Sequence, residues 1–167
     1  MDATPLLEPI RALHAKIRDA VVAACEQQSA ATLAAVDAEE SSDTIYRIDR
    51  VSEEILIADL ASVAAEHSMV VLAEGLAEGS LVLPRGARES NCRWRVLVDP
   101  IDGTRGLMYQ KRSAWILTGV APNRGAETRL RDVVLAVQTE IPLVKQHLSD
   151  QLWATRGGGA RGTRTNR

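Results

Sequence analysis

Apolar side chains recur every three or four residues near the start of the chain, which is the spacing of one helix face. The stripe consists of Leu6, Leu7, Ile10, Leu13, Ile17, Val21, Ala24 and Cys25. This period predicts an amphipathic helix over residues 5–37, with Pro5 in its first turn. A second helix is expected to begin near Asp49, which can cap it. Its predicted inner stripe is Val51, Ile55, Ala58 and Ser62.

Shorter apolar runs follow, and they have the length of buried strands. They predict strands over residues 69–73, 95–98, 113–121, 133–137 and 151–155, after a short extended stretch at 44–48. Residues 38–43 and 75–93 are rich in charges and turn residues and predict loops, and 122–125 predict a turn. Two helices followed mostly by strands favour an α+β fold, in which the helices pack on a mostly antiparallel mixed sheet. Because the strands are apolar runs, we expect both faces of this sheet to be covered.

Length and composition fit one soluble globular domain. The chain has 167 residues, of which 46% are hydrophobic and 25% are charged, and this excludes a disordered chain. No apolar run approaches the roughly 20 residues of a membrane span, and residues 1–5 do not resemble a targeting signal. We therefore expect a cytoplasmic protein with no membrane partner. The two cysteines, Cys25 and Cys92, are too far apart in sequence to indicate a disulfide framework or a cysteine zinc site.

Charge is unevenly distributed, although the formal net charge is only -2. Acids outnumber bases by 16 to 7 in residues 1–90, whereas bases outnumber acids by 13 to 6 in residues 91–167. A basic second half can attract phosphates or nucleic acid. We favour the alternative that the fold brings the two halves together and that their charges cancel, so nucleic acid is the less favoured partner.

The run most suggestive of chemistry is residues 97–104, Leu-Val-Asp-Pro-Ile-Asp-Gly-Thr. An apolar strand here ends in two carboxylates three residues apart, and such neighbours repel each other unless a cation lies between them. Oxygen ligands suit Mg²⁺, which commonly takes one or two carboxylates together with a substrate phosphate. Gly103 allows the backbone to approach a ligand closely, and a helix that begins at Gly103 or Thr104 would direct N–H groups toward an anion.

Two other interpretations compete with this one. Asp99 could simply open a turn and Asp102 cap a helix, but the whole eight-residue run makes this purely structural role the weaker one. A run of D-x-D-G-T marks phosphatases that attack through an aspartate nucleophile. Here two residues separate the acids, which changes the direction of the first carboxylate, so this second interpretation fails.

Residues 94–104, Trp-Arg-Val-Leu-Val-Asp-Pro-Ile-Asp-Gly-Thr, resemble the signature of the inositol monophosphatase family. This superfamily of metal-dependent, typically lithium-sensitive phosphatases includes fructose-1,6-bisphosphatases and bisphosphate nucleotidases. Three further segments are similar to family segments in the same order. They are residues 43–54 before and into the second helix, residues 70–74 with their terminal glutamate, and residues 152–160 with their glycine turn. The resemblance covers about residues 5–160 and implies the first half of a layered αβαβα fold.

The resemblance also implies a role for each matching residue. Mg²⁺ would be held by Glu74, Asp99, the Ile101 carbonyl and Asp102, with Asp99 between two ions. Gly103 and Thr104 would bind phosphate through backbone N–H groups. The Thr104 hydroxyl and Asp49 would be catalytic, because together they would orient and deprotonate the attacking water. A small phosphorylated substrate and a homodimer are further implications.

The chain departs from the family pattern at several points. Gly75 follows Glu74 where a second acid is usual, and Arg105 follows Thr104 where Asn-Phe is common. Residues 105–112 are unusually basic and form either a substrate-side loop or a solvated surface, of which we favour the surface. The largest departure is length, because a second half with another metal-binding aspartate and most substrate contacts has no counterpart.

Two functions of different classes follow from these observations. The first is a Mg²⁺-dependent phosphomonoesterase acting on an inositol, sugar or nucleotide phosphate, as a fragment or a shortened form. The second is a non-catalytic remnant that keeps a Mg²⁺/phosphate pocket and acts as a binding or assembly partner. We expect a metal- and phosphate-binding domain over residues 1–160, a disordered tail over 161–167, and no C-terminal substrate domain.

Overall fold

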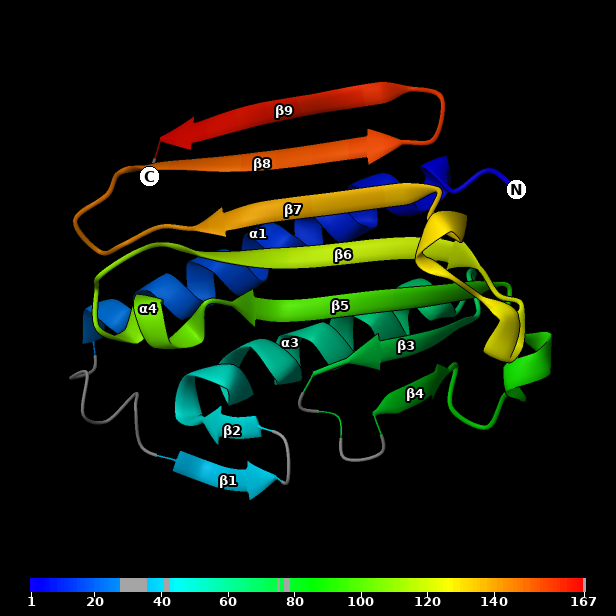
Figure 1. Cartoon of the computed structure of the whole chain (residues 1–167), viewed down its shortest axis with the longest axis horizontal. Coiled ribbons are helices and arrows are strands. Elements are labelled where there is room, and N and C mark those ends of the chain that lie inside the picture. Colours follow the sequence, from blue (N-terminus) through cyan, green and yellow to red (C-terminus); the bar gives the residue numbers. More distant parts are fainter. Residues whose placement is uncertain (28–35, 41–42, 75, 77–78, 167) are drawn as a thin grey trace.

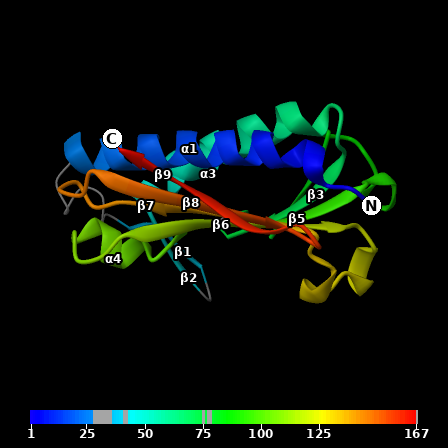
Figure 2. The same cartoon turned by 90° about the horizontal axis from the view of Figure 1, so that it is seen from above.

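A computed structural model describes residues 1–27, 36–40, 43–74, 76 and 79–166 of the chain. Two long helices, α1 (Thr4–Gln27) and α3 (Arg47–Ala64), lie side by side on one face of a seven-stranded sheet. Figure 2 shows these two layers edge-on. The predicted α+β architecture is therefore confirmed.

The sheet is mixed but mostly antiparallel (Figure 1). β3 and β5 pair in parallel, and every other neighbouring pair in this sheet is antiparallel. From one edge to the other the strands are β4 (Ser80–Leu83), β3 (Met69–Ala73), β5 (Trp94–Asp102), β6 (Ala114–Pro122), β7 (Leu135–Ile141), β8 (Leu148–Thr155) and β9 (Gly159–Asn166). A short helix, α4 (Thr104–Met108), follows β5 directly. Single 3₁₀ turns occupy Glu89–Asn91, Gly125–Glu127 and Leu130–Asp132.

The first helix confirms its predicted apolar stripe but not its predicted length. The side chains buried against the sheet include Leu6, Ile10, Leu13, Ile17 and Val21. The helix ends at Gln27, and residues 28–35 lie outside the described part of the chain. Residues 36–37 belong to β1 (Val36–Glu40), which forms a two-stranded antiparallel sheet with β2 (Asp43–Tyr46). The predicted loop over residues 38–43 is thus wrong where these strands lie, because pairing between the two segments outweighs their polar composition.

The second helix begins two residues earlier than predicted and buries a different face. Asp49 lies within its first turn and does not precede it as a cap. The buried positions are Ile48, Ser52, Leu56, Leu60 and Ala64, whereas the predicted stripe is only half-buried at Val51 and Ile55 and is exposed at Ala58 and Ser62. The face that contains two leucines removes more apolar area from water than the face that ends in alanine and serine.

Two predicted irregular segments contain strands. β4 lies within the predicted loop 75–93 and pairs with β3 through residues 80–83. The predicted disordered tail is wrong for residues 161–166, which belong to β9 and pair with β8. Arg164 donates two hydrogen bonds to Asp150, at 2.7 and 2.8 Å, and this bidentate pair joins the two strands. β9 has no apolar periodicity because all its residues are exposed at the sheet edge, so it is defined by backbone pairing with β8 and by this ion pair.

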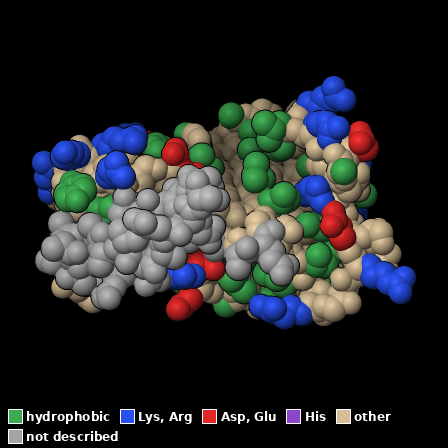
Figure 3. Space-filling model, turned by 60° about the horizontal axis from the view of Figure 1, so that its bottom comes forward, with side chains coloured by type: hydrophobic (Ala, Val, Ile, Leu, Met, Phe, Trp, Pro, Cys, Tyr) green, Lys and Arg blue, Asp and Glu red, His purple; other side chains and the backbone are tan. Residues whose placement is uncertain are grey.

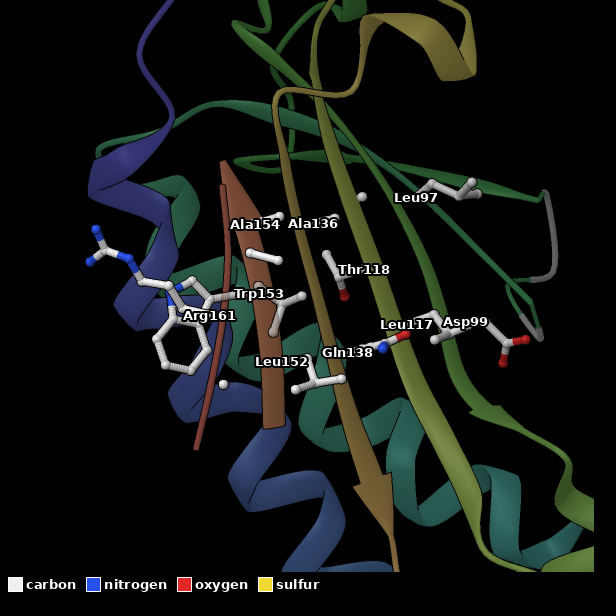
Figure 4. Close-up of a pocket in the computed structure, with 14 residues that line it drawn as sticks. Leu97, Asp99, Leu117, Thr118, Ala136, Gln138, Leu152, Trp153, Ala154 and Arg161 are labelled. Atoms are coloured by element: carbon white, nitrogen blue, oxygen red, sulfur yellow. The ribbon is translucent and has the colours of Figure 1, made fainter. Parts of the chain in front are cut away.

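One face of the sheet is covered by the helices, and the other is open in the described part of the chain. Along β5, the side chains of Trp94, Val96 and Val98 are buried while Leu97 is 48% exposed, which is the alternation of a sheet solvated on one side. Our expectation that both faces are covered is therefore wrong. Leu97, Leu117 and Leu152 help to line a shallow hollow of about 690 Å³ on the open face (Figure 4).

Figure 3 shows hydrophobic side chains gathered in a hollowed region, with Lys and Arg side chains toward both ends of this view. Among the described residues, no helix combines the length and the apolar character that a membrane crossing requires.

Candidate active site

Two parallel strands bring acidic residues to the same edge of the sheet. Ala73, the last residue of β3, is paired with Val98 of β5. Glu74 directly follows β3 and Asp99 is the next residue of β5, so the parallel register places them side by side near the carboxyl ends of these strands. Ligands of open sheets that contain parallel strands bind at this edge.

A bulge in β5 brings the second aspartate to the same face as the first. Asp99 is paired with Leu117 of β6, and Asp102 is paired with Trp115. Three steps along β5 therefore correspond to two steps along β6, which is the one-residue excess of a β-bulge. In a regular strand, residues three apart point to opposite faces. The extra residue in the run that contains Pro100 reverses this and directs both carboxylates to one side.

The site also draws on the first turn of α3, which contributes Asp49. The Thr104 hydroxyl lies 3.1 Å from Asp49 Oδ1 and 2.8 Å from the Ile101 carbonyl oxygen, and its single proton bonds to one of them at a time. The Ile101 N–H donates to Asp99 Oδ1 at 3.1 Å, which orients that carboxylate. These contacts join the end of β5, the start of α4 and α3 in one hydrogen-bonded unit.

Gly103 makes the tight connection between β5 and α4 possible. It precedes the first residue of α4 with φ of 99°, a left-handed conformation that glycine adopts readily. The expectation that a helix begins at Gly103 or Thr104 is thus confirmed. Because α4 starts at once, the Gly103 and Thr104 backbone lies at the edge where the carboxylates converge.

All the residues nominated from the sequence line one pocket of about 430 Å³. The lining consists of Asp49, Glu74, Asp99, Ile101, Asp102, Gly103, Thr104, Arg105, Gly106 and Arg112. The last three come from the basic segment 105–112, for which we favoured a solvated surface; Arg105 and Arg112 are indeed exposed, and they also line this pocket. Only the positive charge of Arg105 and Arg112 could have nominated them as pocket residues, because nothing in the sequence shows how the chain turns after α4.

The donors of this pocket suit a hard divalent cation. Four carboxylates and one backbone carbonyl supply only oxygen, which is the preference of Mg²⁺. Among the described residues, no group of three or more His, Cys, Asp or Glu side chains is placed so that it could hold a metal ion. A Mg²⁺ ion at this pocket would therefore need water ligands and a substrate phosphate in addition to one or two carboxylates. Gly75, a noted departure from the family pattern, lies outside the described residues.

Comparison with known proteins agrees with this geometry. The sequence profile of the inositol monophosphatase family matches residues 3–127. The chain belongs to this family. A comparison with curated protein sequences gives no significant match.

Several solved structures share the fold of this chain and superpose on nearly all of it. Fructose-1,6-bisphosphatase from Leishmania major in its holo form has a TM-score of 0.69 at 16% identity, over 95% of this chain and 49% of its own. Extragenic suppressor protein SuhB from Bartonella henselae has a TM-score of 0.69 at 17% identity, over 97% and 53%. A putative sedoheptulose-1,7-bisphosphatase from Toxoplasma gondii has a TM-score of 0.64 at 14% identity, over 100% and 55%. These likenesses establish the fold, and the chain spans about half the length of each of these structures.

Proposed function

We propose that the chain acts as a Mg²⁺-dependent phosphomonoesterase of the inositol monophosphatase type. The substrate would be an inositol, sugar or nucleotide phosphate, hydrolysed by direct attack of water on phosphorus. The observation that carries the proposal is the hydrogen bond from Thr104 to Asp49 inside a pocket lined by four carboxylates. Family membership and the phosphatase names of the structural neighbours add support.

The pocket residues would have separate roles in binding the metal and the phosphate. Glu74, Asp99, Asp102 and the Ile101 carbonyl would hold Mg²⁺, which supplies positive charge that polarises the ester and makes water more acidic. Gly103 and Thr104 would bind the phosphate through backbone N–H groups. Among the described residues, no cysteine or histidine lines the pocket, and direct attack of water on phosphorus needs no covalent nucleophile.

Thr104 and Asp49 form the proton path. When the Thr104 hydroxyl donates to Asp49, its oxygen can accept a hydrogen bond from water on the pocket side. A proton that leaves this water passes to the hydroxyl oxygen as the hydroxyl proton passes to the carboxylate. The carboxylate is then the general base, and the threonine holds the water in line with it.

The decisive experiment measures phosphate release from a panel of inositol, sugar and nucleotide phosphates, with and without Mg²⁺ and Li⁺. We expect release that requires Mg²⁺, falls with Li⁺ and is lost in the Asp99→Asn chain. Release that persists in a chelator contradicts the proposal. So does a calorimetric titration in which the unaltered chain takes up no Mg²⁺.

The open sheet face favours a second candidate, a binding or assembly partner that keeps the pocket without catalysis. Leu97 and Leu152 are exposed on this face, and Asp99 lines both the hollow and the acidic pocket. Uptake of Mg²⁺ and phosphate without release of phosphate from any ester in the panel would favour this candidate. A small phosphorylated ligand is expected in either case, and a homodimer remains the expected assembly.

A further inference from the structure

Arg112 reaches the acidic pocket from the turn that follows α4. Its side chain lies across two glycines and lines the pocket beside Gly103. A Cβ placed on Gly103 would be 3.6 Å from Arg112 Nη2, so the guanidinium is in contact range of this backbone. Although Arg112 follows α4 and is exposed overall, its charged end therefore lies beside Gly103, one of the two residues proposed to bind phosphate.

Gly106 has no conformational reason to be glycine. Its φ lies outside the left-handed range, and a glycine inside a helix is destabilising by roughly 0.5–1 kcal/mol relative to alanine. A Cβ at this position would lie 2.7 Å from Arg112 Cγ and 2.8 Å from Nε, which is a steric clash. A side chain at position 106 would thus require the Arg112 side chain to move from its present path.

The charges of the pocket leave the guanidinium available to an anion. Arg112 makes no ion pair within the described part of the chain, although four carboxylates line the same pocket. Mg²⁺ held at these carboxylates would attract an anionic ligand to the pocket, and Arg112 would add a positive charge beside it. The neighbouring Lys111 does not line the pocket and lies 5.8 Å from the ring centre of Tyr109.

We propose that Arg112 is a phosphate-binding residue of this site, and that Gly106 positions it. The guanidinium would donate two hydrogen bonds to non-bridging oxygens of the ester phosphate, which an arginine fork matches better than a lysine does. Such a contact selects the dianion of a phosphomonoester over a singly charged phosphodiester. This inference rests on the proposed function, because it assigns a new contact in the same site.

The test is a calorimetric titration of the full chain with inorganic phosphate at a fixed excess of Mg²⁺. We expect Arg112→Gln to weaken phosphate binding about tenfold or more, as loss of charge-assisted hydrogen bonds predicts. Arg112→Lys should lie between this variant and the unaltered chain. Gly106→Ala should weaken binding although it leaves all charges in place. Lys111→Gln is the matched control and should stay within about twofold.

A separate titration with Mg²⁺ alone distinguishes binding of phosphate from loss of structure. Mg²⁺ affinity in Arg112→Gln should be equal to or slightly above that of the unaltered chain, because a nearby positive charge has gone. Equal phosphate affinity in Arg112→Gln and the unaltered chain overturns the role of Arg112 while the proposed function stands. An equal loss in Lys111→Gln also overturns it, because the effect would then be general. No phosphate uptake by the unaltered chain overturns the proposed function and this inference together. If Gly106→Ala fails to fold, the phosphate titrations of Arg112→Gln and Arg112→Lys alone test the role of Arg112.

Discussion

The Thr104 hydroxyl lies 3.1 Å from Asp49 Oδ1, and this contact joins the start of α4 to the first turn of α3 across 55 positions in the sequence. The same hydroxyl lies 2.8 Å from the Ile101 carbonyl oxygen. One side chain therefore touches a proposed base and a proposed metal ligand. The position of α3 on the sheet therefore determines whether the Thr104 hydroxyl meets the Asp49 carboxylate.

Replacement of Thr104 separates the hydroxyl from the rest of the site. We expect Thr104→Val to lower the rate of phosphate release at least about a hundredfold, because the water loses its hydrogen-bonded path to Asp49. The free energy of unfolding should fall by only about 1 kcal/mol, the usual effect of one lost hydrogen bond. Initial rates and urea unfolding measure the two effects.

Thr104→Ser is the matched control, since it keeps the hydroxyl and removes only a methyl group. It should retain most of the activity that Thr104→Val loses. Comparable activity in the valine variant and the unaltered chain would exclude the proposed proton path.

The paired aspartates of the β5 bulge give a second prediction. Asp99→Asn and Asp102→Asn each remove one negative charge while they keep the size of the side chain, so each should weaken Mg²⁺ binding at least about tenfold. Calorimetric titration with Mg²⁺ alone measures this directly. Asp59→Asn on α3 is the control, because Asp59 pairs with Lys16 outside the pocket and should leave Mg²⁺ affinity unchanged. Unchanged affinity in both bulge variants would remove these residues from the metal site.

Much of the candidate site could be nominated from the sequence because many of its residues are contiguous. Residues 97–104 carry the strand, both aspartates, the glycine and the threonine in one run, so local chemistry was sufficient. The strand that ends before Glu74 was also predicted correctly, because five apolar residues form a clear pattern. That Asp99 and Asp102 share a face was not predictable from alternation, since it depends on pairing with β6.

The features that were missed depend on distant partners. The buried face of α3 is selected by the sheet, and both candidate faces contain apolar residues. β9 has no hydrophobic pattern and is held by pairing with β8. Arg112 is brought to the pocket by a turn after α4, and the glycine that admits it resembles any other loop glycine in the sequence. The pattern of neighbouring residues in the sequence predicts none of these three contacts.

A buried histidine gives the third prediction, which concerns pH. His14 of α1 is fully buried, with Nδ1 3.0 Å from Thr139 Oγ1 and Nε2 2.8 Å from Thr118 Oγ1. Burial lowers the pKa of His14 from 6.5 to about 3, so the folded protein holds the neutral ring. Between these two values the unfolded chain binds the proton and the folded chain does not, so stability falls as the pH falls. At pH 5 the loss from this group should be about 2 kcal/mol relative to pH 7.

Urea unfolding at pH 7 and pH 5 measures this loss, and His14→Leu isolates the contribution of the histidine. The variant should be less stable at pH 7, because the buried Thr118 hydroxyl loses its His14 partner and Thr139 keeps only its hydrogen bond from Gln151. Its additional loss at pH 5 should be smaller than that of the unaltered chain by about 2 kcal/mol. An identical pH dependence in both chains would show that His14 does not resist protonation.

The two faces of the sheet give the last prediction, because they differ in how much each leucine contributes to stability. Leu56 of α3 is 1% exposed in the core, whereas Leu152 of β8 is 37% exposed on the open face. Leu56→Ala should lower the free energy of unfolding by about 2 to 4 kcal/mol through lost burial and a new cavity. Leu152→Gln removes little buried area and should lower the free energy of unfolding by less than about 1 kcal/mol.

The double variant Leu97→Gln, Leu152→Gln should also bind less of a hydrophobic fluorescent dye than the unaltered chain, because both side chains contribute to the open apolar surface. A loss of stability in Leu152→Gln as large as that in Leu56→Ala would mean that this face is packed in solution, and dye binding would then be low before any substitution.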